Sequence, residues 1–266
     1  MKLSISNIAW PAEYDDEMYN FLSVNNFQGL EIAPTRIFPE EPYENLNRGK
    51  VFARKLEEKY NIKISSMQSI WYGIAESVFG PAGARQKLID YTKKAVDFAC
   101  GINCPNLVFG CPKNRAVPTG MPPEIYLPVI YGFFNQIGDY AADCGTCIAI
   151  EPNPPIYNTN FINTTAEAAE LCRGLNNPGI KINADTGTVI YNNEDIKILT
   201  ENIDLINHIH ISEPGLIPIE KRTLHKDLRD GLKSSGYNKY ISVEMGNPGN
   251  IDLVKTVIAY IKEIFI

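Results

Sequence analysis

Histidine and tryptophan are scarce in this sequence, with three and two residues among 266. Long hydrophobic runs are missing as well, and no stretch approaches the ~18 apolar residues of a membrane-spanning helix. The first residues, MKLSISNIAW, lack the extended apolar stretch of a signal peptide. We therefore expect a protein that has no membrane partner and is cytoplasmic.

Positive charge is also in short supply. Lys and Arg number 25 against 31 Asp and Glu, which gives a formal net charge of −6. A protein that binds nucleic acid irrespective of sequence needs a basic surface, so this balance argues against nucleic acid as a partner. No GxGxxG motif follows the first expected strand, which argues against a nicotinamide-dependent enzyme. A small molecule is the expected partner.

The six cysteines form a single CxxC pair, Cys144-Gly-Thr-Cys147. Such spacing serves redox chemistry or half of a zinc site, but no second pair exists and no histidine lies near it in the sequence. We interpret the segment as a helix end that runs into a buried strand. Unpaired thiols in a chain of this length fit a reducing compartment.

Short apolar segments rich in Ile and Val recur along the chain, and each is followed by a longer amphipathic stretch. Hydrophobic residues at helical spacing predict helices over 85–102, 164–175 and 250–265, and Thr164 with Glu167 is a capping signal for the second of these. We expect eight strands, at 3–10, 29–34, 62–70, 106–112, 147–153, 180–187, 206–214 and 240–246.

Eight strands that alternate with helices predict an α/β protein with a parallel sheet. At about 33 residues a unit, a single (β/α)8 TIM barrel is the economical architecture. An open, doubly wound sheet is the alternative. No linker, low-complexity tract or change of composition divides the chain, so we expect one domain over 1–266. The proline-rich segments 37–46 and 116–124 are expected as loops after strands, on the active face of a barrel.

A side chain able to bind metal stands at the end of each of the last four expected strands. These residues are Glu151, Asp185, His210 and Glu244, separated by 34, 25 and 34 residues. Because the carboxyl ends of barrel strands converge on one face, all four side chains are expected to point at one place. Ionisable groups in apolar strands are costly unless they are paired or bind a metal. The alternative is that each is an ordinary surface residue at a strand end.

Three carboxylates and one imidazole suit a hard or borderline divalent cation. Mn²⁺, Mg²⁺ or Co²⁺ fits this set better than a metal that prefers thiolates, and Zn²⁺ is possible. With a neutral imidazole the set carries a charge of about −3. One dication therefore leaves negative charge over, which can serve as a base.

Alternation along the strands places further polar residues beside this set. His208 shares the face of His210, and the same parity places Asn183 beneath Asp185. We expect His208 and Asn183 to hydrogen-bond around the ligands rather than to bind the ion. Two of the three histidines then lie in one strand because one ring binds the metal and the other orients its surroundings.

The ends of these strands resemble, in order and spacing, those of the sugar-phosphate isomerase/epimerase family of xylose isomerase-like barrels. That family includes ketose 3-epimerases, inosose dehydratases and hydroxypyruvate isomerases. The resemblance implies a (β/α)8 barrel with one divalent metal ion held by the four residues above, and it implies that Glu151 and Glu244 act as acid and base. The motifs are IEPNP (150–154), NADTG (183–187), HIHISEPG (208–215) and ISVEMG (241–246).

The resemblance also implies chemistry at the α-hydroxy carbonyl group of a sugar, a sugar phosphate or a related compound. The metal would polarise the carbonyl and stabilise an enediolate, while one glutamate removes a proton and the other returns one. Return to the opposite face gives epimerisation, return to the adjacent carbon gives isomerisation, and loss of a hydroxyl gives dehydration. A metal-dependent dehydratase or lyase, and a non-catalytic barrel that binds a sugar, are the alternatives.

Two differences from related proteins limit which properties the resemblance implies for this chain. The epimerases often have a histidine three residues after the aspartate, where it helps to bind substrate, and this chain has Thr188 there. Their substrate contacts therefore do not transfer. Apurinic endonucleases share the barrel superfamily, but they need more histidine and acidic ligands than three histidines allow, and a basic surface toward DNA.

Ten further residues are candidates for substrate contact because they lie at or after expected strand ends. Lys113 and Arg115 would favour an anionic substrate such as a phosphate or a carboxylate, and the indole of Trp71 would stack on a sugar ring. A salt bridge, loop packing or a solvated loop is the ordinary alternative for each. The sequence is compatible with a homo-oligomer. The ten are Glu31, Gln68, Trp71, Lys113, Arg115, Asn153, Asn160, Thr188, Glu213 and His225.

Overall fold

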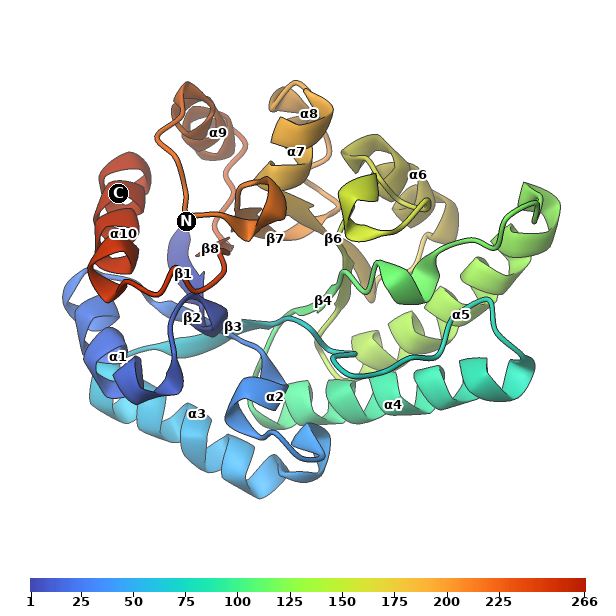
Figure 1. The fold of residues 1–266 in the computed structure, drawn as a ribbon, viewed down its shortest axis with the longest axis horizontal. Helices are drawn as coiled ribbons and strands as arrows, with labels where there is room; N and C mark the ends of the chain where they lie inside the picture. Colours follow the sequence, from blue (N-terminus) through green and yellow to red (C-terminus); the bar gives the residue numbers. More distant parts are fainter.

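Eight parallel strands form a closed barrel at the centre of the molecule, in a computed structural model that describes residues Met1–Ile266. Each strand pairs with the next along the chain, and β1 pairs with β8 to close the barrel (Figure 1). This closure confirms the TIM barrel and rules out the open sheet. The strands are β1 (Lys2–Ser6), β2 (Gly29–Ile32), β3 (Lys63–Met67), β4 (Leu107–Phe109), β5 (Ile148–Ile150), β6 (Ile180–Asp185), β7 (Ile206–Ile211) and β8 (Tyr240–Val243).

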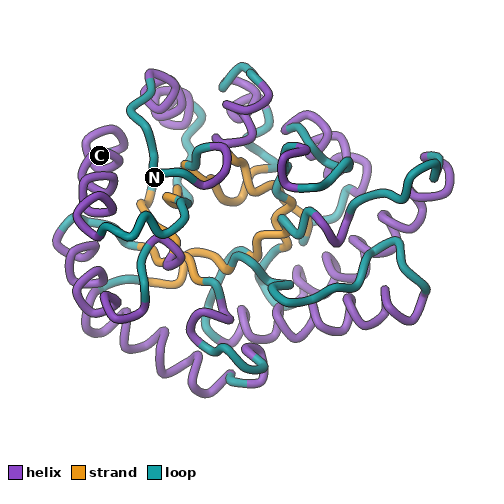
Figure 2. Tube along the Cα trace, viewed as in Figure 1, coloured by secondary structure: helices purple, strands orange, loops and turns teal.

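Ten α-helices surround the strands, as the outer ring in Figure 2 shows. The last helix illustrates why they pack there, because Val254, Ile258, Ile261 and Phe265 recur at helical spacing and are all buried. The helices are α1 (Asp15–Val24), α2 (Pro34–Ile37), α3 (Leu46–Tyr60), α4 (Ala82–Gly101), α5 (Pro123–Asp143), α6 (Thr165–Leu175), α7 (Thr186–Asn192), α8 (Lys197–Glu201), α9 (Thr223–Ser234) and α10 (Ile251–Phe265).

The helix predicted over 164–175 is confirmed together with its cap. Thr164 precedes α6, and its hydroxyl oxygen accepts the backbone N–H of Glu167 at 3.2 Å. The carboxylate of Glu167 in turn accepts the backbone N–H of Asn163. These contacts satisfy N–H groups that have no partner inside the helix.

All eight strands end earlier than the apolar segments suggested. The segment 180–187 illustrates the reason, because β6 ends at Asp185 and α7 begins at Thr186. The carboxylate of Asp185 accepts the backbone N–H of Thr188 and so caps this helix directly at the strand end. The chain likewise enters a short 3-10 helix, Asn7–Ala9, directly after β1, and α2 begins at Pro34, two residues after β2.

The register of the strands aligns polar residues of β6, β7 and β8 with one another. Asp185 is paired in register with His210, and Asn183 with His208. His210 is in turn level with Ser242 of β8. The inward-facing layer of β6, β7 and β8 is therefore polar, whereas the outward-facing residues of these strands are apolar and pack under the helices.

The CxxC segment joins a helix to a strand, as interpreted. Cys144 follows the last residue of α5, and Cys147 is buried directly before β5. All six cysteines are free thiols. None of the helices combines the length and the apolar character that a membrane crossing requires.

Candidate metal centre

Four side chains from four consecutive strands converge at the carboxyl end of the barrel. One potential ligand atom from each of Glu151, Asp185, His210 and Glu244 lies within 4.8 Å of the others. Glu151 and Glu244 directly follow β5 and β8, while Asp185 and His210 lie in β6 and β7. All four are buried. Convergent carboxylates and an imidazole at this spacing are the donor set of a divalent metal site.

The imidazole of His210 is oriented so that one nitrogen faces the carboxylates. Its Nδ1 lies 2.8 Å from Oε1 of Glu151 and 3.2 Å from Oε2 of Glu244, yet no hydrogen bond satisfies it. Its Nε2 lies 2.8 Å from Oε2 of Glu31. A buried nitrogen without a hydrogen-bond partner, directed at carboxylates, fits the residues to a metal ion bound through Nδ1.

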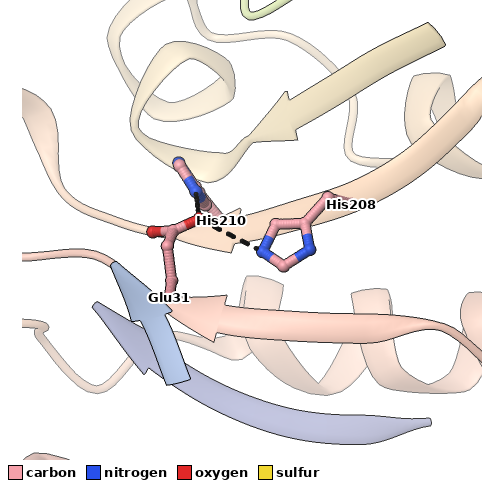
Figure 3. Close-up of side chains that lie close together, drawn as sticks. All are labelled: Glu31, His208 and His210. Atoms are coloured by element: carbon pink, nitrogen blue, oxygen red, sulfur yellow. Dashed lines mark hydrogen bonds and ion pairs between the residues drawn. The ribbon is translucent and has the colours of Figure 1, made fainter. Parts of the chain in front are cut away.

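Glu31 lies between the two histidines of β7, as Figure 3 shows. Its Oε2 is 2.8 Å from Nε2 of His210 and 3.4 Å from Nε2 of His208. All three side chains are buried. Burial lowers the pKa of His208 to about 3, so this ring is neutral. Burial alone would raise the pKa of Glu31, but the neighbouring His210 reverses the shift and keeps Glu31 an anion.

Amides and hydroxyls fix two of the carboxylates. Asn183 donates to Oε1 of Glu151 at 2.8 Å, and Asn153 donates to Oε2 of the same residue at 3.0 Å. The hydroxyl of Ser212 contacts Oδ1 of Asp185. Asn183 was predicted to hydrogen-bond around the ligands, and its role in a metal site stays a prediction. Fixed ligands are preorganised for an ion because they lose little freedom on binding.

The crowding of acidic groups raises two pKa values. Burial, together with the nearby Glu151, raises the pKa of Asp185 to about 6. Burial raises the pKa of Glu244 to about 7, although His210 opposes the shift. Burial acts in the opposite direction on His210, but the charges of Glu31 and Glu244 hold its pKa well above its usual value. The cluster therefore holds protons at neutral pH that an incoming cation would displace.

A cavity of about 190 Å³ opens above the acidic cluster. Gln68 and Asn153 line it, as do three of the four expected ligands. Of the ten residues predicted for substrate contact, these two border the cavity. The amide of Gln68 also donates to the hydroxyl of Ser6 at 2.6 Å, which fixes its side chain.

Two of the predicted contact residues instead support the ligands from behind. Glu31 binds His210, as described above. The hydroxyl of Thr188 lies 2.7 Å from the carbonyl oxygen of Pro152 and 2.9 Å from Oδ2 of Asp185. Thr188 is fully buried, and its hydroxyl holds the carboxylate of Asp185 in place.

The remaining six predicted contact residues do not line this cavity. The indole of Trp71 is buried and donates to Thr92, while Lys113 is exposed. Arg115 is buried and donates to the carbonyl oxygens of Phe109, Glu151 and Ile162. The six residues that the structure places outside the cavity are Trp71, Lys113, Arg115, Asn160, Glu213 and His225. The contact of these six with a substrate stays a prediction.

Local hydrogen bonds account for the other three side chains of that group. Asn160 binds both the N–H and the carbonyl of Val117 and so joins two loops. Glu213 forms a bidentate ion pair with Arg222, with distances of 2.7 and 2.6 Å. The ring of His225 lies 2.9 Å from the hydroxyl of Tyr260.

The sequence analysis missed Tyr157, which borders the cavity. Its hydroxyl oxygen accepts the backbone N–H of Gly215 at 2.8 Å, which ties the loop after β5 to the loop after β7. Burial raises the pKa of Tyr157 to about 12, with the acidic cluster adding to the shift. Its position two residues after Asn153-Pro-Pro was the only signal, because no helical or strand periodicity covers this turn.

Comparison with known proteins places this geometry in context. Residues 22–264 match the model of a family described as xylose isomerase-like TIM barrel. No curated protein sequence is significantly similar to the chain. Among solved structures, one similar fold is the apo form of 3-keto-D-glucoside 4-epimerase, YcjR, from E. coli, with 16% identity, 99% of both chains covered and a TM-score of 0.81.

Two further structures show how widely the fold is shared. D-psicose 3-epimerase in the presence of D-fructose has 15% identity and a TM-score of 0.78, over 100% of this chain and 99% of that chain. The probable 3-DHS dehydratase AsbF from Bacillus anthracis has 14% identity and a TM-score of 0.76, over 97% of this chain and 98% of that chain. At such low identities these similarities establish the fold.

Proposed function

Because the chain belongs to the xylose isomerase-like TIM barrel family, we propose that it is a divalent-metal-dependent isomerase or epimerase. Its substrate is a sugar or a related α-hydroxy carbonyl compound. The observation that carries the proposal is the group of four buried ligands, Glu151, Asp185, His210 and Glu244, with ligand atoms within 4.8 Å of one another. The neighbours named as epimerases of a keto-glucoside and of D-psicose support the same class of reaction.

Mn²⁺, Mg²⁺ or Co²⁺ is the expected ion, because three of the four donors are carboxylates. When bound, the cation supplies an electrophile that polarises a substrate carbonyl and stabilises negative charge on its oxygen. Glu151 and Asp185 would hold it through oxygens that Asn183, Asn153 and Ser212 already fix. His210 would contribute Nδ1.

Glu244 is the side chain best suited to remove a proton from the substrate. No amide or hydroxyl donates to its carboxylate, whereas two amides hold Glu151. Burial raises the pKa of Glu244 to about 7, and a general base works best when its pKa lies near the working pH. Glu244 borders the cavity, so its carboxylate reaches a substrate placed there.

Glu151 is the second acid–base group. It borders the same cavity from β5, three strands away from Glu244 along the barrel. A substrate that lies between the two carboxylates loses a proton to one and receives a proton from the other. Return to the other face of the same carbon gives an epimer, and return to the neighbouring carbon gives an isomer.

A dehydratase is the second candidate, and the similarity to the probable dehydratase AsbF is the observation that favours it. Removal of a proton next to a carbonyl is common to both reactions. They differ in whether a hydroxyl on the adjacent carbon then leaves as water. The mass of the product separates them, since an epimer or isomer keeps the mass of the substrate.

Calorimetric titration of chelator-stripped protein with Mn²⁺ is the first test. We expect about one ion per chain, with binding lost in Glu151→Gln and Asp185→Asn. Glu201→Gln, an exposed acid on α8, is the matched control and should bind as the wild type does. Failure of the wild type to bind any of Mn²⁺, Mg²⁺ or Co²⁺ would contradict the proposal.

The second test measures chemistry. Mn²⁺-loaded protein in D₂O is mixed with a panel of ketoses and aldoses, and mass spectrometry follows deuterium incorporation at carbon. Metal-dependent uptake without loss of water supports an epimerase or isomerase. Loss of water supports the dehydratase, and tight sugar binding without uptake would indicate a barrel that only binds.

A further inference from the structure

A second cavity lies on the same face of the barrel as the cavity bordered by Glu151, Asp185 and Glu244 (the metal cavity), and adjoins it. It encloses about 610 Å³, lies between the loops that follow β1, β2, β3 and β8, and shares Ser69 with the metal cavity. The metal cavity itself, at about 190 Å³, is smaller than the ~300 Å³ at which ordinary ligand pockets begin. Because the two cavities share Ser69, they are neighbours, and a ligand too large for the metal cavity would have room to extend into the second.

The walls of the second cavity carry aromatic and uncharged polar groups. Tyr72, Trp10 and Ile8 supply apolar surface, and Thr35 and Asn247 supply a hydroxyl and an amide. Tyr72 is 71% exposed, which leaves its ring open to a ligand. An open aromatic ring with polar groups around it is suited to the apolar face and the hydroxyl groups of a sugar.

The single charged residue on these walls is already neutralised. The guanidinium of Arg36 lies 2.7 Å from Oδ1 of Asp15 and 3.3 Å from its Oδ2. It also donates to the carbonyl oxygen of Trp10 at 3.0 Å. Asp15 already occupies the paired Nη1 and Nη2 donors, and the second Nη2–H is used by Trp10, so Arg36 has no free pair of donors for a bidentate contact with phosphate or carboxylate.

The metal cavity provides no protein cation for an anionic substrate either. No Lys or Arg borders it, while Glu151, Asp185 and Glu244 do. Lys113 is exposed outside the cavity, and Arg115 is buried against backbone carbonyls. A phosphate on the substrate would meet carboxylates without the Arg or Lys partners that normally bind it.

We propose that the substrate is an uncharged sugar derivative of two units. Its reacting unit lies in the metal cavity, and a second uncharged ring, such as another sugar, lies against Tyr72 in the second cavity. This inference rests on the proposed function, because the metal site defines which unit reacts. It goes further because it assigns the charge and the length of the substrate.

Two matched series of sugars test the inference on the Mn²⁺-loaded protein. The first is D-fructose, isomaltulose (the same ketose with a glucosyl unit on oxygen 6) and D-fructose 6-phosphate. The second is D-glucose, isomaltose and D-glucose 6-phosphate. Within each series the same hydroxyl carries nothing, a neutral ring or a phosphate. Calorimetry measures Kd, and deuterium uptake from D₂O measures reaction.

We expect the glucosyl derivative to bind about three- to tenfold more tightly than the parent hexose in at least one series. The 6-phosphate should bind no more tightly than the parent. Tyr72→Ala should remove the gain and leave the Kd of the parent hexose unchanged. Tyr191→Ala, an exposed aromatic residue on α7 outside both cavities, is the control and should change neither value.

Two results would overturn the inference alone, both obtained while the parent hexose still binds and exchanges. One is a 6-phosphate that binds more tightly than the glucosyl derivative. The other is a glucosyl derivative that gains nothing in either series. Absence of both binding and deuterium uptake for all six sugars would instead contradict the proposed function, and this inference with it.

Discussion

The carboxylate of Glu31 and the imidazole of His210 meet inside the barrel although 179 residues separate them, with 2.8 Å between Oε2 and Nε2. When Nε2–H donates to Glu31, Nδ1 is the nitrogen left for a metal ion. It faces Glu151 and Glu244. Glu31 thereby fixes both the tautomer and the direction of the histidine ligand.

Removal of Glu31 should therefore weaken metal binding without removing any ligand. We expect Glu31→Ala to lower the affinity for Mn²⁺ by about 10- to 100-fold. Glu31→Gln keeps an oxygen that accepts from Nε2 and should lose less. Calorimetric titration of stripped protein measures both variants.

The control is a second fully buried glutamate with a different partner. Glu213 pairs with Arg222 and does not contact His210. Glu213→Gln should lower the free energy of unfolding but leave the Mn²⁺ affinity within about twofold. Equal affinities of wild type and Glu31→Ala would show that Glu31 does not position His210.

Metal binding should release protons. Burial raises the pKa of Glu244 to about 7 and that of Asp185 to about 6, and nearby carboxylates hold the pKa of His210 well above its usual value. The metal-free site binds protons that the ion must displace, so affinity should rise with pH between about 5 and 8. Calorimetry at pH 6.5 in buffers of different ionisation enthalpy counts the protons released. A binding heat that does not depend on the buffer would refute this expectation.

The convergence of four side chains, Glu151, Asp185, His210 and Glu244, was predictable because the position of each depends on local pattern alone. An apolar run that ends in an acid or a histidine places that side chain at the carboxyl end of a strand. The register then aligns Asp185 with His210 and Asn183 with His208. Parity placed His208 and His210 on the same face of β7, and the position of His210 nearer the carboxyl end of the strand distinguished it from His208.

The contacts that cross the barrel were not predictable in this way. No local pattern connects Glu31 with His210, so sequence analysis assigned Glu31 to substrate contact. Tyr157 lies on a turn whose direction depends on its hydrogen bond to Gly215 in another loop. Arg115 and Glu213 were predicted to contact substrate, with a solvated loop as the alternative, whereas their partners in the structure are backbone carbonyls and Arg222.

Lys113 and Arg115, two residues apart, should respond differently to the same substitution. Arg115→Met removes a donor from the buried carbonyl oxygens of Phe109, Glu151 and Ile162. The carbonyls of Phe109 and Ile162 each keep one backbone N–H. We expect a loss of about 2–4 kcal/mol in the free energy of unfolding. Lys113→Met, at an exposed position, should change it by less than about 0.5 kcal/mol. Urea unfolding compares the two, and equal effects would contradict a structural role of Arg115.

His225 should make stability depend on pH. Burial lowers its pKa to about 4, and its Nε2 has no hydrogen-bond partner. Between pH 6.5 and 4 the unfolded chain therefore binds a proton that the folded protein does not. The contribution of the neutral His225 ring to the free energy of unfolding is therefore fully present above pH 6.5 and is lost as the pH falls toward 4. The loss should reach about 2 kcal/mol at pH 5. If His225→Gln, which has no such proton, shows the same pH dependence of urea unfolding as the wild type, the assignment is wrong.

Gly110 should control the position of a metal ligand. A Cβ atom at this residue would lie 2.9 Å from Oε2 of Glu151 and 3.5 Å from Oδ1 of Asn153. Asn153 and Asn183 hold that carboxylate in place, so Gly110→Ala must displace it or strain its hydrogen bonds. We expect Mn²⁺ affinity to fall about tenfold or more.

The matched control for Gly110→Ala is Gly132→Ala, on the open side of α5. No atom lies within 4 Å of a Cβ placed at Gly132. Because alanine favours the helix, this variant should gain about 0.5–1 kcal/mol in the free energy of unfolding and keep its Mn²⁺ affinity. If Gly110→Ala binds Mn²⁺ as tightly as Gly132→Ala does, then the carboxylate of Glu151 tolerates displacement. The site would then owe its affinity to the other three ligands rather than to a glutamate held in a fixed position.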